Sequence, residues 1–293
     1  SCRRNSLRDV IHRSPYYSGT FYPKDKSDLN KLLNFCFIES EFGPQQIQKI
    51  NKNNNNKYKI YGLIVPHGAY IFSGAISANA YFEINDQNID TFILIGPDHK
   101  GIGKRISIMS EGSWQTPLGN VLINKEITKD LKTHNNIIIE DKLVHQFEHS
   151  LEIQIPFLQY SRLNSFTIVP MLLKDQDIET SLILGNSLAK SISRKNAIII
   201  ASSDLTHYEL NLNAYEKDFR LIKSIEKLDI ELFYQTIRDL NISICGYGAI
   251  ASLMRAVQLL GSKTGVLLKY ATSGDITLDN KNTVVAYAAI AFV

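Results

Sequence analysis

The chain has 293 residues, 44% of them hydrophobic, and a formal net charge of +3, so it can bury a substantial core and gives no reason to expect a nucleic acid or an anionic membrane as partner. Its cysteines, Cys2, Cys36 and Cys245, are odd in number and widely spaced, which argues against a disulfide framework or a zinc ribbon and fits a reducing compartment. The longest apolar stretch, 284–293, is far shorter than the roughly 20 residues that span a bilayer, and no signal-peptide pattern opens the chain, so we expect a soluble, cytoplasmic protein.

After the first fifth of the chain, strand and helix patterns alternate. The asparagine-rich segment 51–59 predicts a surface loop. Runs rich in β-branched residues predict strands at 60–65, 91–95, 166–170 and 197–201, and apolar spacing predicts helices at about 73–82, 150–160 and 178–190. This alternation predicts an α/β fold with helices on both faces of the sheet.

Two further groups of segments complete the pattern. Segments 105–110, 114–119 and 121–124 predict an antiparallel insertion with Pro117 and Gly119 at its turn, so the sheet is expected to be mixed. Toward the C-terminus the pattern predicts helices at 213–227 and 229–240, a turn at 245–248, a helix ending at Leu260, and strands at 266–270 and 283–293. The sequence contains no internal repeat.

Histidines follow two successive predicted strands. Pro66 ends the first strand, Gly68 lets the backbone turn, and His67 between them is placed above the sheet, with Ser73 expected to cap the next helix. His99 follows the second strand in a segment that contains Gly96, Pro97, Asp98 and Gly101. A single histidine in such a turn is more often a hydrogen-bonded residue than a ligand. Two of them at strand carboxyl ends, where chemistry collects in open α/β sheets, favour a metal site.

Two more segments contribute candidate residues. Asp204 and His207 follow the strand at 197–201 and suit ligation or general-base work; the alternative is that Asp204 caps a turn and His207 lies on the surface. Cys245 precedes Gly246 and Gly248 at a predicted helix start, which would expose the sulfur and favour its thiolate as a ligand or nucleophile. By itself, such a cysteine is commonly a small buried hydrophobe.

A rival metal motif lies at 145–149, where HQFEH matches the H-x-x-E-H pattern of inverzincins. In that pattern a helix presents two histidines to zinc, here His145 and His149, while the glutamate, here Glu148, activates water. Helical spacing of Phe147, Leu151, Ile155 and Leu158 would place the two histidines on one face. The motif does not explain the candidates at strand ends. His12 and His134 have no such context and are expected on the surface.

A set of motifs occurs in a fixed order along the chain: RSPYYSGTFYP, VPHGAYIFSGAISANAY, FILIGPDHKG, SWQTPLGNV, EHSLEIQIPFLQ, IVPML, ASSDLTHYE, ICGYGAI and VVAYAAIAF. From about Arg13 to the C-terminus this set resembles the Memo family, and more narrowly its prokaryotic members called AmmeMemoRadiSam system protein B. The resemblance implies one domain over 1–293: a three-layer α/β/α fold with a central mixed sheet and a metal-binding cleft, like that of the class III extradiol non-haem iron dioxygenases.

The resemblance also implies roles for individual residues. His67, His99 and Cys245 match the metal-contacting positions, and Asp204 and His207 match other polar residues of the cleft. The EHS motif places His149 near them, for proton transfer or substrate contact, and makes the H-x-x-E-H match coincidental. Two departures stand out. The order Gly68-Ala69 is reversed relative to the family's usual pattern, and a cysteine replaces the carboxylate of the dioxygenase facial triad, so ring cleavage does not follow from the fold.

The leading hypothesis is a non-haem metal-dependent, oxidoreductase-like protein, with Fe2+ as the metal and copper or zinc as alternatives. His67, His99 and Cys245 would hold the metal, and His207, Asp204 and His149 would serve catalysis on an unidentified small molecule or peptide. Two alternatives remain open: a zinc-dependent hydrolase with the same ligands, and a non-catalytic adaptor that binds a peptide or protein in the same cleft. The system name implies a functional association with AMMECR-type and radical SAM proteins.

Overall fold

The computed structural model describes residues 11–47, 58–162 and 164–293. Most of the predicted surface loop at 51–59 therefore lies outside the described residues, as does Cys2; only Tyr58 and Lys59 of that loop are described, and both are exposed and outside any helix or strand. No helix of the described part is both long and apolar enough to cross a membrane.

Twelve strands in the described part of the chain form one mixed sheet. They are β1 (His12–Arg13), β2 (Gly62–Val65), β3 (Thr91–Pro97), β4 (Ile106–Ile108), β5 (Ser113–Thr116), β6 (Gly119–Ile123), β7 (Ile138–Glu140), β8 (Thr167–Leu173), β9 (Ala197–Ser202), β10 (His207–Glu209), β11 (Gly265–Thr272) and β12 (Val284–Phe292). The main order is β1-β5-β6-β8-β3-β9-β2-β12-β10, with β11 paired to β12, and β4 paired to β7 and β8. Strands β8, β3, β9 and β2 run parallel, so their carboxyl ends share one edge.

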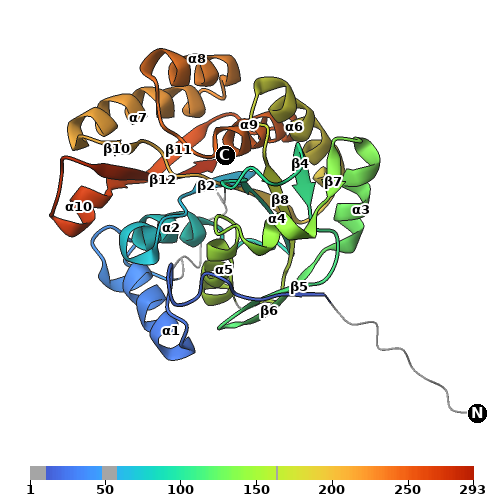
Figure 1. Cartoon of the computed structure of the whole chain (residues 1–293), viewed down its shortest axis with the longest axis horizontal. Coiled ribbons are helices and arrows are strands. Elements are labelled where there is room, and N and C mark those ends of the chain that lie inside the picture. The colour runs from blue at the N-terminus through green and yellow to red at the C-terminus, as the bar shows by residue number, and fades with distance from the viewer. Residues whose placement is uncertain (1–10, 48–57, 163) are drawn as a thin grey trace, which may run out of the picture.

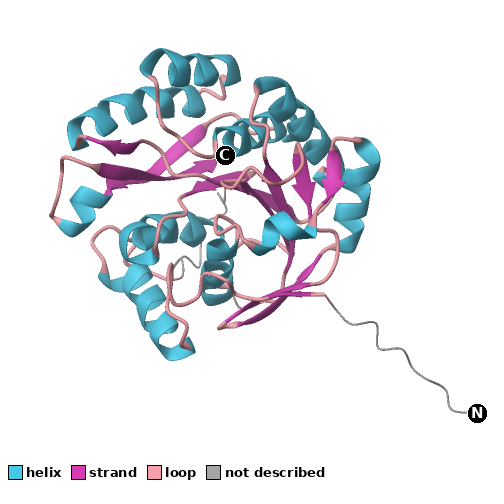
Figure 2. Ribbon diagram, in the orientation of Figure 1, coloured by secondary structure: helices cyan, strands magenta, loops and turns pink. Residues whose placement is uncertain are grey.

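Helices cover both faces of this sheet (Figures 1 and 2). They are α1 (Lys26–Asn34), α2 (Tyr70–Ile84), α3 (Lys125–His134), α4 (Lys142–Gln146), α5 (Ile155–Ser161), α6 (Ile178–Ile192), α7 (Asn211–Glu226), α8 (Ile230–Leu240), α9 (Tyr247–Leu260) and α10 (Ser273–Thr277), with a π-helical turn at Phe35–Glu39 and a 3-10 turn at Glu152–Gln154. Helices α1, α2 and α5 pack on one face, and α3, α6, α7, α8 and α9 on the other.

Alternating side chains of the central strands build the two cores. On β2, Leu63 and Val65 face the α1/α2/α5 side, whereas Ile64 faces the α6/α9 side. On β3, Ile93 lies in the core on the α6/α9 side, and Leu94 lies in the core on the α1/α2/α5 side. Because successive side chains of a strand point to opposite faces, a strand that is apolar at every position must be covered on both. The predicted three-layer α/β/α fold with a mixed sheet is confirmed.

Three local expectations were wrong. Ser73 does not cap a helix: α2 begins at Tyr70, and the Ser73 hydroxyl donates to the Gly68 carbonyl oxygen at 2.8 Å from inside the first turn. The segment around β4 does not join the β5–β6 hairpin but pairs with β7 and β8. In this position its isoleucines, Ile106 and Ile108, are buried in the core that also contains residues of α3 and β7. The helix expected at 150–160 is a 3-10 turn followed by α5, in which Pro156 lies in the first turn, where proline is tolerated.

Candidate metal centre

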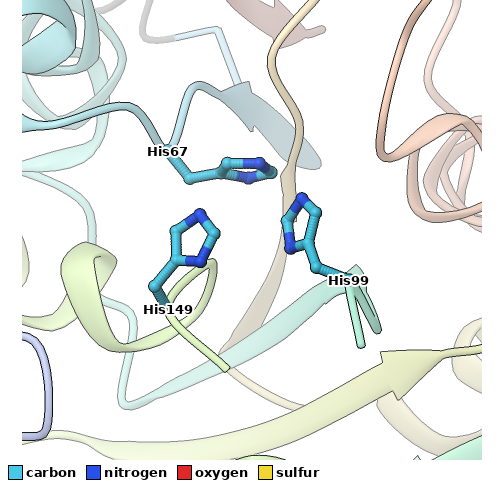
Figure 3. A group of neighbouring side chains, drawn as sticks. All are labelled: His67, His99 and His149. Carbon is cyan, nitrogen blue, oxygen red and sulfur yellow. The ribbon is translucent and has the colours of Figure 1, made fainter. Parts of the chain in front are cut away.

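Three histidines from separate segments meet at the carboxyl edge of the sheet (Figure 3). His67 follows β2, His99 follows β3, and His149 lies between α4 and the 3-10 turn. One ligand nitrogen from each lies within 4.8 Å of those of the other two. The His99 and His149 rings are stacked with centroids 4.7 Å apart, and the His67 ring stands edge-on to both at 5.0 and 5.2 Å. The order β3-β9-β2 explains this approach, since only one strand separates the ends that carry His67 and His99.

The three imidazoles differ in solvent access. His67 is 1% exposed, whereas the side chains of His99 and His149 are 31% and 20% exposed. Burial, followed by the charge of His99, lowers the pKa of His67 well below its usual value. Burial, followed by the neighbouring His67, lowers the pKa of His149 to about 3. Both rings are therefore neutral at physiological pH, which is the form that binds a metal.

Glu148 organises His99. One carboxylate oxygen accepts the His99 backbone N–H at 2.9 Å, and the other accepts its Nδ1–H at 2.8 Å and the Ser150 N–H at 3.0 Å. Burial alone would raise the pKa of Glu148, but the hydrogen bond and charge of His99 outweigh it and lower the pKa to about 2. The same contact overcomes burial and raises the pKa of His99. Because an ionised carboxylate can only accept, Nδ1 of His99 carries the proton in the neutral ring, and Nε2 is then the nitrogen with the lone pair.

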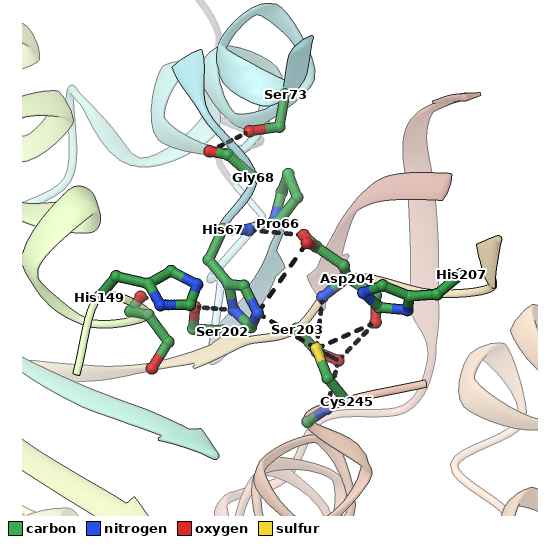
Figure 4. Close-up of polar contacts among 12 residues, drawn as sticks. Pro66, His67, Gly68, Ser73, His149, Ser202, Ser203, Asp204, His207 and Cys245 are labelled. Atoms are coloured by element: carbon green, nitrogen blue, oxygen red, sulfur yellow. Dashed lines mark hydrogen bonds and ion pairs between the residues drawn. The ribbon is translucent and has the colours of Figure 1, made fainter. Parts of the chain in front are cut away.

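Cys245 lies on the side of the His67 ring that faces away from His149 (Figure 4). Its Sγ is 3.1 Å from His67 Nε2, and it accepts the Asp204 backbone N–H at 3.3 Å. It is not part of the three-histidine group. The expected exposed thiolate was wrong: the residue is half-buried, and burial, followed by the charge of Asp204, raises the pKa of the thiol despite the start of α9 nearby. A metal that binds this sulfur would have to displace the thiol proton.

Asp204 and His207 lie on the same side of the His67 ring as Cys245 (Figure 4). Asp204 is 5% exposed, and its Oδ1 accepts the His67 backbone N–H at 2.7 Å while Oδ2 lies 3.9 Å from His67 Nε2. Burial raises the pKa of this carboxyl even though the His67 N–H favours its charged form. His207 lies on β10, and its Nδ1 donates to the Ser243 carbonyl oxygen at 2.7 Å. In the neutral tautomer this bond makes Nε2 the nitrogen with the lone pair.

The inverzincin arrangement at 145–149 was wrong. Helix α4 ends at Gln146, so His145 and His149 do not share a helix face. His145 is fully buried, its Nδ1 donates to the Asp141 carbonyl oxygen at 2.7 Å, and it is not part of the histidine group. Glu148 receives hydrogen bonds from His99 instead of facing water. His12 is exposed, as expected, and His134 is half-buried on α3.

Sequence reasoning missed a buried residue that holds segment 145–152 in place. Arg13, 1% exposed, donates from Nε to the His145 carbonyl oxygen at 2.6 Å, from Nη2 to that of Glu148 at 2.9 Å, and from Nη1 to the Glu152 carboxylate at 2.7 Å. Its guanidinium also lies 4.3 Å from the centre of the Trp114 ring. An arginine in a motif near the N-terminus gives no signal of burial, since most arginines are exposed.

Comparisons of the sequence with known proteins show one family. The sequence model of the family described as Memo-like protein matches residues 13–291. MEMO1 family proteins from Nitrosopumilus maritimus and Methanopyrus kandleri are 40% and 37% identical to this chain, each over 96% of this chain and 99% of the relative. A solved structure of an uncharacterized protein from Escherichia coli K12 covers 79% of this chain and 99% of its own, with 11% identity and a TM-score of 0.48.

Proposed function

Because this chain belongs to the Memo family, we propose that it is a metal-dependent protein in which His67, His99 and Cys245 hold ferrous iron, and that it acts as an oxidoreductase on an unidentified small molecule or peptide. The observation that carries the proposal is that two imidazoles and a thiol lie close together. Cys245 Sγ is 3.1 Å from His67 Nε2, and His67 and His99 belong to one compact group. Mixed imidazole and thiolate donors suit iron, copper and zinc.

The donors fit a resident metal in a second respect. A metal-binding histidine usually donates its other ring N–H to a carboxylate or carbonyl group, which fixes the ring and raises its basicity. Glu148 supplies this contact to His99 at 2.8 Å. When bound, iron would supply one-electron redox chemistry that these side chains lack.

The remaining side chains act on the substrate and its protons. The Nε2 lone pair of His207 accepts a proton, because its Nδ1 is committed to the Ser243 carbonyl group. Asp204 holds the His67 backbone and places a second carboxylate oxygen beside the imidazole. His149, stacked on His99 and partly exposed, contacts the substrate or adds a further nitrogen donor to the metal.

The test is anaerobic purification, loading with ferrous iron and metal analysis of single variants. His67→Ala and Cys245→Ser should each lose stoichiometric iron, whereas the control His134→Ala, which removes an imidazole on α3, should retain it. Iron binding that survives both site variants, or no iron or copper binding by the wild type, would remove the proposal.

The same donor set supports zinc-dependent hydrolysis as a second candidate. Two imidazoles and a thiolate with an open position are also the ligands of catalytic zinc sites, and His67 is neutral and ready to bind. Turnover that follows added zinc and is abolished by Cys245→Ser would favour hydrolysis over redox chemistry. Peptide binding that is unchanged in His67→Ala, without turnover, would instead favour a non-catalytic adaptor.

A further inference from the structure

A buried serine hydroxyl, that of Ser202, contacts Nδ1 of His67 (Figure 4). Ser202 is the last residue of β9, and its Oγ has three hydrogen-bonding neighbours: the Ser150 carbonyl oxygen at 2.7 Å, His67 Nδ1 at 2.9 Å and Gln154 Nε2 at 3.1 Å. Ser202, Ser150 and Gln154 are all 0% exposed. In such a place polar groups must satisfy one another.

The orientation of the Gln154 amide is fixed by its other neighbours. Its Nε2 lies 2.9 Å from the Pro66 carbonyl oxygen, which can only accept, so the amide nitrogen must face this side. Its Oε1 accepts the Tyr81 hydroxyl at 2.6 Å. Rotating the amide by half a turn would place two acceptors face to face at Pro66. The second N–H of this amide therefore faces Ser202 Oγ at 3.1 Å and the Ser150 carbonyl oxygen at 3.3 Å, and Gln154 donates to both.

The number of protons available at Ser202 then decides which nitrogen of His67 is protonated. A hydroxyl has one proton and two lone pairs. The proton goes to the Ser150 carbonyl oxygen, and one lone pair accepts the Gln154 N–H. The lone pair that remains can only accept, so His67 Nδ1 must donate. We infer that Ser202, supported by Gln154, is a positioning residue that fixes His67 as the Nδ1–H tautomer and leaves the lone pair of Nε2 directed at Cys245.

This inference deepens the proposed function, and the part that concerns the metal rests on it. In the opposite tautomer an Nε2–H bond would point at Cys245 Sγ, 3.1 Å away, and would block coordination through that nitrogen. With Ser202 in place, His67 presents its lone pair before any metal arrives. Holding a ligand in its binding form in this way lowers the cost of metal binding.

The first test determines the His67 tautomer in the wild-type protein. Metal-free protein labelled with 15N-histidine gives imidazole nitrogen shifts that separate a protonated nitrogen from a bare one, and His67→Asn assigns the His67 signals by their absence. The expected spectrum shows His67 with Nδ1 protonated and Nε2 bare. A spectrum with Nε2 protonated would overturn the inference, whether or not the protein binds iron.

The second test removes the hydroxyl. Ser202→Ala should mix the two His67 tautomers and weaken ferrous iron binding, measured anaerobically by chelator competition, by roughly 10–100-fold. The matched control is Ser224→Ala, which deletes the hydroxyl of a buried serine of α7 that donates to the Leu221 carbonyl oxygen at 2.6 Å within the same helix. This control should leave both readouts unchanged. An unaltered tautomer in a folded Ser202→Ala protein would overturn the inference, whereas a mixed tautomer in a chain that binds no iron would refute the proposed function alone.

Discussion

Three connections carry the histidines of the candidate centre, and the two that carry His67 and His149 are held in different ways. The one that carries His67 joins β2, which pairs with β9 and β12 on its two sides, to the 15-residue helix α2. The one that carries Glu148 and His149 joins α4, with five residues, to a 3-10 turn of three. Regular elements fix the first connection at both ends. The second has no such support and is held by side chains that donate to its carbonyl groups: Arg13, which is 132 positions away from His145 in the chain, and Tyr17, whose hydroxyl donates to the Phe147 carbonyl oxygen at 2.6 Å.

The difference shows which part of the site is held by regular secondary structure and which part depends on a few side-chain donors. A strand in the middle of a sheet loses many hydrogen bonds and apolar contacts if it moves, so the residue that follows it is firmly placed. A segment of isolated carbonyl groups is only as well placed as the donors that satisfy those groups. Arg13 supplies such donors to His145 and Glu148 together.

The largest effect is therefore expected from Arg13→Met. The change removes a buried cation and leaves the Glu152 carboxylate, which is 0% exposed, without its cationic partner. Loss of one partner from a buried ion pair typically costs about 3–5 kcal/mol. Urea denaturation should show this loss of unfolding free energy.

The exposed pair Lys31–Asp28 offers a matched control. Its side chains are 75% and 62% exposed, so Lys31→Met should change the unfolding free energy by less than about 0.5 kcal/mol. The double variant Arg13→Met, Glu152→Met should recover part of the loss, because no unpaired charge is left behind. If Arg13→Met behaved like Lys31→Met, the second connection would not depend on Arg13.

A smaller loss is expected from Gly68→Ala in the first connection. We expected Gly68 to serve the turn, yet its φ is not positive; an added Cβ would lie 2.9 Å from the Tyr287 ring. Forcing a carbon into such a contact costs about 1–3 kcal/mol. Thermal or urea unfolding of Gly68→Ala, alone and combined with Tyr287→Leu, forms a double-mutant cycle. Equal losses in the two backgrounds would show that the ring is not the cause.

Glu148→Gln separates charge from shape in the second connection. The neutral amide keeps the size of the side chain but loses the charge that raises the pKa of His99, so an NMR titration should show this pKa lowered. The folded pKa of Glu148 is about 2, below its unfolded value of about 4.3, so its contribution to stability is present above pH 4.3 and is lost as the pH falls toward 2. The variant should therefore lose less stability than the wild type between those pH values. Identical acid unfolding curves would contradict this account.

The fold could be predicted where elements are long and buried. The central strands are runs of β-branched residues, and each appears within a few residues of its expected bounds, as with 197–201 and β9. Helix α3 and strand β7 were missed because they are short and bury few apolar side chains, Ile127 and Leu131 in α3 and Ile138 in β7. The partners of β4 could not be predicted either, because pairing with β7 and β8 depends on segments far along the chain.

Part of the candidate site could likewise be predicted from the sequence, and part could not. Strand ends predicted that His67 and His99 would approach each other, and the structure places them in one group. The sequence also indicated His149, but its position beside His99 depends on where α4 ends. A helix that stops at Gln146 cannot be distinguished, by spacing alone, from one that continues through the H-x-x-E-H motif. Long-range donors such as Arg13 decide that point.

The smallest effect is expected from changing the helix cap that precedes the second connection. Asp141 caps α4, and its carboxylate accepts the Val144 N–H at 3.3 Å. Asp141→Ala should cost about 1 kcal/mol, as for other helix caps, and Asp141→Asn should cost less because asparagine also caps. If the Arg13 contacts hold the segment, neither variant should alter the His99 or His149 imidazole signals in NMR spectra, because α4 can fray while the carbonyl groups of His145 and Glu148 stay bound. Displaced imidazole signals in Asp141→Ala would instead show that the short helix, not the arginine, places Glu148 against His99.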